Sequence, residues 1–289
     1  MSLEALLISY EIPIRLTAFF GVFTAVAAWE HLAPRRALSL SKGGRWLNNL
    51  GLIALNSVVV RLLFPTAAIG LAAFCSREGW GLLNHFALDS SAAIVFAVVV
   101  LDFTIYLQHV LMHSVPALWR LHRMHHADLD YDVTTGARFH PFEIALSMLV
   151  KMAAIVVLGP SVVAVIIFEV LLNATAMFNH GNIHLSKKVD KRVRLITVTP
   201  DMHRVHHSID DDEANSNFGF NLPWWDRLFG TYKDQARKGH KDMVLGIHQH
   251  RDPKQVNQLL GMLALPFKGR IINYAINRRQ WSEPNEKQE

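Results

Sequence analysis

Four long apolar tracts limit what this chain can fold into. The tracts are Ile12–Trp29, Leu50–Phe74, Ser91–Met112 and Ile144–Met177. The first three carry one charged residue each, although hydrophobic residues make up only 51% of the chain. A helix that crosses a bilayer needs about 20 residues of this kind. One such tract would fit a buried helix of a soluble protein, but four predict an all-α, polytopic membrane bundle.

The fourth tract is long enough to turn back on itself. Gly159 and Pro160 stand near its middle, and these two residue types favour a reversal because proline cannot continue a helix. Each limb then has roughly 17 residues, or about 25 Å of helix. We therefore expect about four spans, the last of them a helical hairpin. Lys151 and Glu169 lie at similar distances from the turn, and an unpaired charge at that depth is costly, so we expect the two to pair.

Charge between the tracts predicts the orientation in the membrane. The first loop is basic: after Glu30, which directly follows the first tract, it carries Arg35, Arg36, Lys42 and Arg45 and no further acid. The second loop has Arg77 against Glu78 and Asp89. Cytosolic loops are enriched in Lys and Arg, so the first loop is expected in the cytosol. The third tract then returns to the cytosolic face, which puts its last turns there. A multi-pass protein of a bacterial inner membrane or the endoplasmic reticulum is expected.

The net charge of +5 has the same explanation. The basic residues gather between the apolar tracts and form no stripe with interleaved aromatic residues, which argues against a nucleic-acid partner. The single cysteine, Cys75, lies inside an apolar tract and is expected to pack there. One cysteine excludes an intramolecular disulfide framework.

Ten of the 16 histidines fall into four short motifs, a pair and a triple that then recur in the same order. The motifs are His109-x-x-x-His113, His122-x-x-His125-His126, His180-x-x-x-His184 and His203-x-x-His206-His207. On a helix, residues three or four apart share a face. Each motif is therefore expected to aim imidazoles at one point, as paired helical histidines do in known metal motifs.

Ten imidazoles are too many for one ion, since a structural zinc site needs four ligands. We therefore expect two metal ions held by these ten histidines. Imidazole suits iron, zinc, copper and nickel, so the spacing alone does not choose the metal. Iron is favoured on chemical grounds, because a redox-inert ion has no evident use for such a cage at a membrane face.

The chain also resembles a known family from about Asp102 to Tyr232. The segments that carry the resemblance, besides the histidine motifs, are Asp102-x-x-x-Tyr106-x-x-His109, Thr135-Gly-Ala-Arg138-Phe-His140-Pro141-Phe-Glu143, Thr199-Pro200-Asp-Met-His203 and Leu222-Pro-Trp-Trp-Asp226-Arg227-Leu-Phe-Gly230-Thr-Tyr232. They resemble the fatty acid hydroxylase and sterol desaturase superfamily of integral membrane, non-haem di-iron oxygenases. The resemblance implies a membrane bundle with a cytosolic cap that holds two irons. It also implies oxidation of a lipid with dioxygen and electrons from a partner protein.

Four further residues are candidates for supporting roles. His140 is a candidate additional ligand or ligand-orienting group, or else it fixes its loop. Asn179 and Asp201 are candidates for orienting ring nitrogens. Asp102 lies about 10 Å along the helix from His109, too far to orient that ring. It is expected to bond a neighbouring helix or to line the substrate path.

These patterns predict three regions and one function. Residues 1–100 are expected to form N-terminal membrane helices, 101–235 the catalytic domain with its hairpin, and 236–289 an interfacial segment with a polar tail. The expected function is hydroxylation, in preference to desaturation, of a lipid or sterol-like substrate by O2 at a di-iron centre. An external protein supplies the electrons, because no haem, flavin or nicotinamide motif is evident. The alternatives are a metal-binding or transport protein, or a catalytically silent relative.

Overall fold

The computed structural model describes residues 3–86 and 88–269. Within these ranges every regular secondary-structure element is a helix, and the β-type pairings are isolated bridges. The predicted all-α class is therefore confirmed. Of the expected C-terminal region 236–289, the part from 270 onwards lies outside the described residues.

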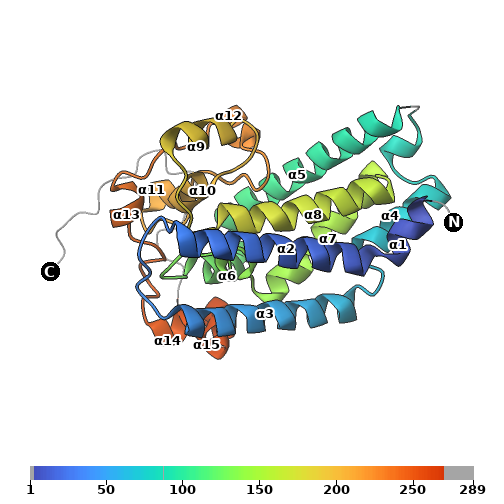
Figure 1. Cartoon of the computed structure of the whole chain (residues 1–289). Helices are drawn as coiled ribbons and strands as arrows, with labels where there is room; N and C mark the ends of the chain where they lie inside the picture. The colour runs from blue at the N-terminus through green and yellow to red at the C-terminus, as the bar shows by residue number, and fades with distance from the viewer. Residues whose placement is uncertain (1–2, 87, 270–289) are drawn as a thin grey trace.

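Long helices run side by side along the molecule (Figure 1). They are α2 (Glu11–Leu32), α3 (Lys42–Leu63), α5 (Ser90–Ser114), α7 (Pro141–Leu158) and α8 (Val162–Asn179). By length and composition, five stretches can cross a membrane, namely Glu11–Leu32, Lys42–Asn84, Ser90–Ser114, Pro141–Leu158 and Val162–Asn179. The polytopic bundle is thus confirmed, with the two limbs of the last hairpin counted separately. The short helix α1 (Leu3–Ser9) lies at one end of the bundle.

The second apolar tract forms two helices, because a proline interrupts it. α3 ends at Leu63 and α4 (Ala67–Glu78) begins just after Pro65. Proline lacks the backbone N–H and disfavours helical geometry in the residue before it. Packed against α7 and α8, α4 covers the end of the bundle that carries α1 (Figure 1).

The predicted reversal in the fourth tract is confirmed. α7 ends at Leu158, and the next residue, Gly159, has a φ of +65°, which lies in the left-handed region. A Cβ on this glycine would stand 2.4 Å from the carbonyl oxygen of Trp80, so no larger residue fits. The Ser161 side chain then caps α8 by accepting from the N–H of Ala164.

The predicted pair across this hairpin is also confirmed. Lys151 Nζ lies 2.6 Å from Glu169 Oε1, and the Glu169 side chain is only 2% exposed. A second cation, Arg15 of α2, lies 3.3 Å from the other carboxylate oxygen. Glu169 therefore joins three long helices.

Short helices form a cap at the opposite end of the bundle (Figure 1). They are α6 (Pro116–His126), α9 (Lys187–Val193), α10 (Pro200–His206), α11 (Asp211–Ala214), α12 (Trp224–Leu228), α13 (Gly239–Asp242), α14 (Pro253–Asn257) and α15 (Leu259–Ala264), with 3-10 turns η1 (Leu82–Asn84), η2 (Thr135–Ala137) and η3 (Leu265–Phe267). All lie at the cap except η1, which follows α4. The ends of α2, α5 and α8 and the starts of α3 and α7 meet this cap.

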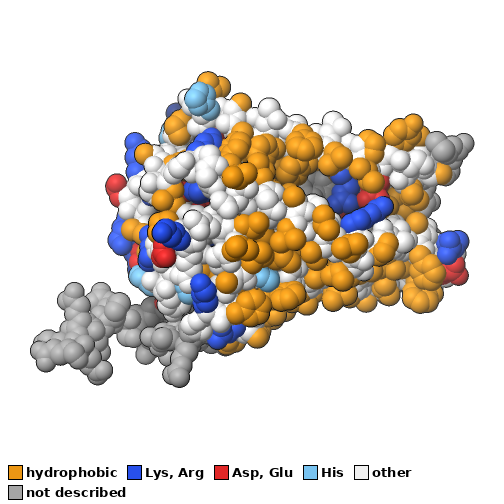
Figure 2. Space-filling view, turned by 90° about the horizontal axis from the view of Figure 1, so that it is seen from below, with side chains coloured by type: hydrophobic (Ala, Val, Ile, Leu, Met, Phe, Trp, Pro, Cys, Tyr) orange, Lys and Arg blue, Asp and Glu red, His pale blue; other side chains and the backbone are white. Residues whose placement is uncertain are grey.

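Apolar side chains both fill and coat the bundle. The largest buried cluster packs between α4, α5, α7 and α8 and includes Ile105, Ile155 and Phe168. Outside, large apolar residues such as Phe20 and Leu62 are exposed, and Figure 2 shows apolar side chains over much of this surface. Such a coat is typical of a surface in contact with lipid rather than water.

Candidate metal centre

The cap and the helix ends bring nine of the ten motif histidines into two adjacent groups. In each group one nitrogen from every ring lies within 4.8 Å of those of the others, and every ring is buried. The five-histidine group is His109, His113, His122, His126 and His206. The four-histidine group is His125, His180, His203 and His207.

Each triple contributes to both groups. His122 and His126 belong to the five-histidine group, whereas His125 belongs to the other. Neighbouring residues of a helix point about 100° apart, because 3.6 residues make a turn. Adjacent histidines therefore face different groups. The second triple repeats the arrangement, because His206 belongs to the five-histidine group whereas His203 and His207 belong to the four-histidine group. The two groups meet where the rings of His126 and His207 stack at 4.5 Å.

His184 is not part of either group. The prediction took His180 and His184 as one helical turn, but α8 ends at Asn179 and the chain beyond it is not helical. The side chain of His184 is exposed, and its Nδ1 lies 3.3 Å from an Arg35 nitrogen. Its backbone N–H donates to Ala33 at 3.0 Å, which holds the residue against the loop after α2.

Two of the other candidates have structural partners away from the rings. His140 belongs to neither group: its Nδ1 caps α7 by accepting from the N–H of Phe142, and its Nε2 lies 3.3 Å from the carbonyl of Leu263. Asp201 bonds Arg35 at 2.9 Å and Arg204 at 2.5 Å. Both therefore fix the cap rather than the histidines.

Asp102 and Asn179 hold the segment that covers the five-histidine group. Asp102 accepts from Trp225 Nε1 at 2.8 Å and from two backbone N–H groups at 221 and 222. Asn179 donates to the carbonyl of Phe220 at 3.1 Å. These contacts bind residues 220–225 to α5 and α8.

The second ring nitrogen of four histidines has a fixed acceptor. His109 Nδ1 donates to the carbonyl of Phe218 and His206 Nδ1 to that of Ser216, both at 2.7 Å. His180 Nδ1 donates to the carbonyl of Ala176 at 2.7 Å. His122 Nδ1 lies 2.6 Å from Glu143 Oε1. A neutral imidazole that donates from Nδ1 has a bare lone pair on Nε2.

These tautomers bring lone pairs face to face. Nε2 of His109 lies 3.1 Å from that of His122 and 3.0 Å from that of His206. Two bare nitrogens cannot hydrogen-bond each other, so this contact needs a cation between them. Nitrogens about 2.1 Å from one ion and at right angles are about 3.0 Å apart. The donor set of the five-histidine group therefore fits a metal ion.

The four-histidine group fits as well. Both ring nitrogens of His203 are buried without a hydrogen-bond partner among the described residues, and so is Nδ1 of His125. Burial lowers the pKa of His180 to about 3 and holds the pKa of His203 and His207 well below the ordinary value. The rings are thus neutral, the form that binds metal ions.

Residues that the sequence reasoning did not single out position the rings. Glu143 belongs to a quoted segment, but no spacing rule connects it to His122, 21 positions earlier. The loop that supplies the carbonyls of Ser216 and Phe218 is held by Asp226, which accepts from the N–H groups of Phe218 and Gly219. Burial raises the pKa of Asp226 to about 6. Backbone carbonyls leave no sequence signal.

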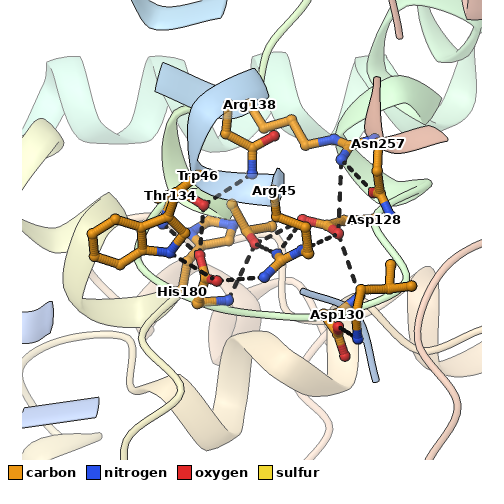
Figure 3. Close-up of polar contacts among 12 residues, drawn as sticks. Arg45, Trp46, Asp128, Asp130, Thr134, Arg138, His180 and Asn257 are labelled. Carbon is orange, nitrogen blue, oxygen red and sulfur yellow. Dashed lines mark hydrogen bonds and ion pairs between the residues drawn. The ribbon is translucent and has the colours of Figure 1, made fainter. Parts of the chain in front are cut away.

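A buried ionic network joins the first turn of α3 to the loop after α6 (Figure 3). Arg45 is 2% exposed and bonds Asp128 at 2.7 Å and also Asp132. Asp128 lies 3.7 Å from Arg138, which reaches Asn257 of α14 at 3.2 Å. Arg45, which the sequence analysis counted among the basic residues of the first loop, therefore forms ion pairs with buried carboxylates of the cap.

A cavity of about 740 Å³ leads from the bundle to the five-histidine group. Its walls come from α2, α3, α5, α7 and α8, and His109 and His122 line its inner end. Most of the lining is apolar, with Arg15, Lys151 and Glu169 further out. Figure 2 shows charged side chains inside a hollow of the apolar surface.

A helical membrane bundle with buried groups of convergent histidines at one end defines a membrane metalloprotein of the polyhistidine type. Comparison with known proteins then gives the family. Residues 94–231 match the family model described as fatty acid hydroxylase. The chain therefore contains a fatty acid hydroxylase domain over these residues, and the relatives that it matches belong to the fatty acid hydroxylase and sterol desaturase superfamily.

The relatives are named for lipid oxidations. The ornithine lipid hydroxylase OlsE of Rhizobium tropici is 27% identical over 87% of this chain and 76% of its own length. Human alkylglycerol monooxygenase is 28% identical over 47% of this chain, which spans only 30% of that protein. Methylsterol monooxygenase 2-2 of Arabidopsis thaliana is 25% identical over 58% of this chain and 64% of its own length. No solved structure matches significantly. By this relationship the chain is an oxidoreductase.

Proposed function

We propose that this chain is a di-iron oxygenase that hydroxylates a membrane lipid, with O2 and electrons from a separate donor protein. The observation that carries the proposal is the convergence of bare Nε2 atoms of His109, His122 and His206 beside an apolar cavity. A cavity of this kind suits an alkyl chain, and the lone pairs suit a metal ion at its inner end.

The proposed ligands are the nine grouped histidines, with His184 outside the set. Two iron ions held there would supply the oxidising power for an unactivated C–H bond. One oxygen atom of O2 enters the C–H bond, and the other leaves as water with two electrons and two protons from outside. Glu143 keeps His122 in its ligating tautomer. The cavity walls orient the substrate and exclude water.

Hydroxylation is proposed ahead of desaturation because a relative that aligns with 87% of this chain is named as a hydroxylase, and another is named as a monooxygenase. A relative from Nicotiana tabacum, 26% identical, is named as a Delta(7)-sterol-C5(6)-desaturase. If this chain were a desaturase, its substrate would lose two hydrogens and gain no oxygen.

We further propose that the cap faces the cytosol, where a reduced donor protein can reach it. The basic loop after α2 lies at the cap end and supports this orientation. Arg35, Arg36 and Arg45 of that loop bond the cap itself, so their positive charge is partly neutralised. The orientation can be tested with a single cysteine introduced into one loop at each end of the bundle. A membrane-impermeant thiol reagent added to intact cells should label the cysteine at the end opposite the cap and not the one at the cap.

The rivals are a metal transporter or store and a silent relative. A transport path would have ligands spaced along a span, whereas these nine gather at one end of the bundle. A silent relative is expected to lose ligating residues, and only one of the ten motif histidines lies outside the groups.

Two measurements on purified full-length protein test the proposal. Elemental analysis should find about two irons per chain, and lipids from cells that express it should include species heavier by one oxygen atom. His125→Ala should abolish the mass shift and retain membrane insertion. Stoichiometric zinc with no altered lipid in any extract, or full activity of His125→Ala, would contradict the proposed centre.

A further inference from the structure

The cap has an exposed apolar surface of its own, where α9 and α12 lie next to each other (Figure 1). Six large apolar side chains, exposed by 46–70%, lie on these two helices and on the turns that follow them, namely Val189, Leu195, Ile196, Trp224, Leu228 and Phe229. The Nε1 of Trp224 donates to the carbonyl of Leu195 at 2.7 Å, so α12 and the turn after α9 form one surface. Exposed apolar patches of this kind mark contacts with a partner or a membrane.

Unpaired positive charge lies beside this surface. α9 exposes four cations, namely Lys187, Lys188, Lys191 and Arg192. The one acid of this helix, Asp190, is buried and pairs with Arg194 at 2.7 Å. Among the described residues the four exposed cations form no ion pair. Free lysines next to exposed apolar residues are typical of a segment that lies at a membrane interface.

α12 lies at a depth where the bundle itself is coated with apolar side chains. The ring of Trp225, on α12, packs on that of Phe103, on α5, with the ring centroids 4.7 Å apart. Phe103 lies about 16 Å along the axis from Ser114, the last residue of α5. Phe96 and Leu111, on either side of this level of α5, are 51% and 52% exposed. α12 therefore lies beside a part of a candidate span whose outer surface is apolar.

A basic and apolar surface suits either a bilayer that contains anionic lipid or an acidic protein such as an electron donor. The depth of α12 decides between them. A soluble protein could reach the cations of α9, but the bilayer occupies the space beside α5 at the level of Phe103. Apolar side chains of α12 are exposed at this level, Leu228 by 70%. The observations therefore favour lipid.

We propose that α9, α12 and the turn after α9 form a membrane anchor of the cap. The apolar side chains of α12 and of the turn insert below the lipid headgroups, and the lysines of α9 bind the phosphates of anionic phospholipids. The anchor goes beyond the proposed function and needs neither metal nor substrate. Because α12 begins within residues 220–225, which cover the five-histidine group, the anchor also holds that cover against the bilayer.

Spin labels at introduced cysteines test the insertion in full-length protein in which Cys75 is replaced by alanine. Leu228→Cys and Ile196→Cys place the label on the anchor, and Val244→Cys, at a residue that is 40% exposed and lies outside the anchor, is the control. The protein is reconstituted in nanodiscs of phosphatidylcholine and phosphatidylglycerol. We expect the labels at 228 and 196 to collide with dissolved O2 more often than with a water-soluble nickel complex, and the label at 244 to show the reverse order.

Two short-chain lipids test the cations of α9. Dioctanoyl phosphatidylglycerol and dioctanoyl phosphatidylcholine are titrated against full-length protein in a neutral detergent. We expect the anionic lipid to bind more tightly, by about fivefold for each lysine near its phosphate, and about 1 M salt to abolish the preference. Lys188→Gln/Lys191→Gln should reduce the preference at least about fivefold. Lys241→Gln/Lys254→Gln is the matched control, because it removes exposed lysines of α13 and α14, and it should keep the preference.

The wild-type affinities and the labels decide the proposal even if a lysine variant fails to fold. Equal affinities for the two lipids, or a preference that both double variants retain, would overturn the lipid site. Labels at 228 and 196 that meet the nickel complex as freely as the label at 244 would overturn the insertion, and an acidic redox protein that then shields them would assign the surface to the electron donor. Neither measurement depends on iron or on lipid oxidation, so the anchor and the proposed function stand or fall separately.

Discussion

Replacing Lys151 by Met removes one of the two cations that neutralise the buried carboxylate of Glu169. The Lys151 side chain is 11% exposed and Glu169 2%, so water screens their 2.6 Å contact only slightly. Loss of one partner of a buried ion pair costs about 3–5 kcal/mol when the other charge is left alone. Here Arg15 still lies 3.3 Å from the carboxylate. We therefore expect Lys151→Met to lower the free energy of unfolding by about 1.5–3 kcal/mol, the value of one charged hydrogen bond.

The double variant Lys151→Met/Glu169→Met should be nearly as stable as the wild type. Replacement of a buried ion pair by apolar residues of similar size is often close to neutral, and Arg15 keeps its bond to Glu11. The coupling energy between the two positions is then the sum of the two single-variant costs, and it should be at least about 1.5–3 kcal/mol, the cost of Lys151→Met alone. Reversible unfolding in detergent micelles measures it, with Arg61→Met as a control for loss of an exposed cation. A coupling below about 0.5 kcal/mol, the usual error of additivity, would refute the argument.

Three further predictions concern the site and the cap. The His184→Ala variant should keep its metal content and activity within about twofold, because the ring is exposed and lies outside both histidine groups. The His203→Ala variant should lose iron, and its turnover should fall at least about 100-fold. Equal losses of metal and turnover in the two variants would contradict the assignment of His203, and not His184, as a ligand. Ferrous or zinc ion at about 1,000 times its dissociation constant should stabilise the metal-free protein by about 4 kcal/mol, a rise of roughly 8–16 °C in Tm that a chelator reverses; an unchanged Tm would argue against metal binding. Burial lowers the pKa of His240 from 6.5 to about 4. The free energy of unfolding therefore carries no penalty from this residue above pH 6.5, and it falls by roughly 3 kcal/mol as the pH is lowered to about 4. His240→Gln should flatten the dependence of stability on pH between these values, and an unchanged dependence would refute the burial argument.

The long-range frame of the fold was predictable because it follows from local rules. Apolar length predicts the spans, and the Gly159-Pro160 pair predicts the reversal between α7 and α8. The Lys151–Glu169 contact followed from equal distance to that turn. Arg15 was not foreseen as their partner, because no sequence rule connects α2 with α8.

The histidine pattern predicted that the rings converge, but it did not predict correctly which ring belongs to the groups in every case, because His184 lies outside them. The i,i+4 rule assumes a continuous helix, and α8 stops at Asn179 before the turn that would carry His184. The ring tautomers depend on the carbonyls of Ser216 and Phe218, whose position comes from a loop held by Asp226. A folded loop determines these contacts, and a spacing pattern does not contain it.

The doubled motif suggests two equal sites, yet the folded groups differ in what faces them. The histidines that line the cavity within the described structure are His109 and His122, both of the five-histidine group. The four-histidine group is covered by aromatic rings, with Phe139 stacked on His125 and Tyr131 on His180. A substrate in the cavity therefore approaches the group with more nitrogens. The other group has one fewer ring because α8 ends before His184. A metal ion held by its four histidines would therefore have room for a ligand that these side chains do not supply.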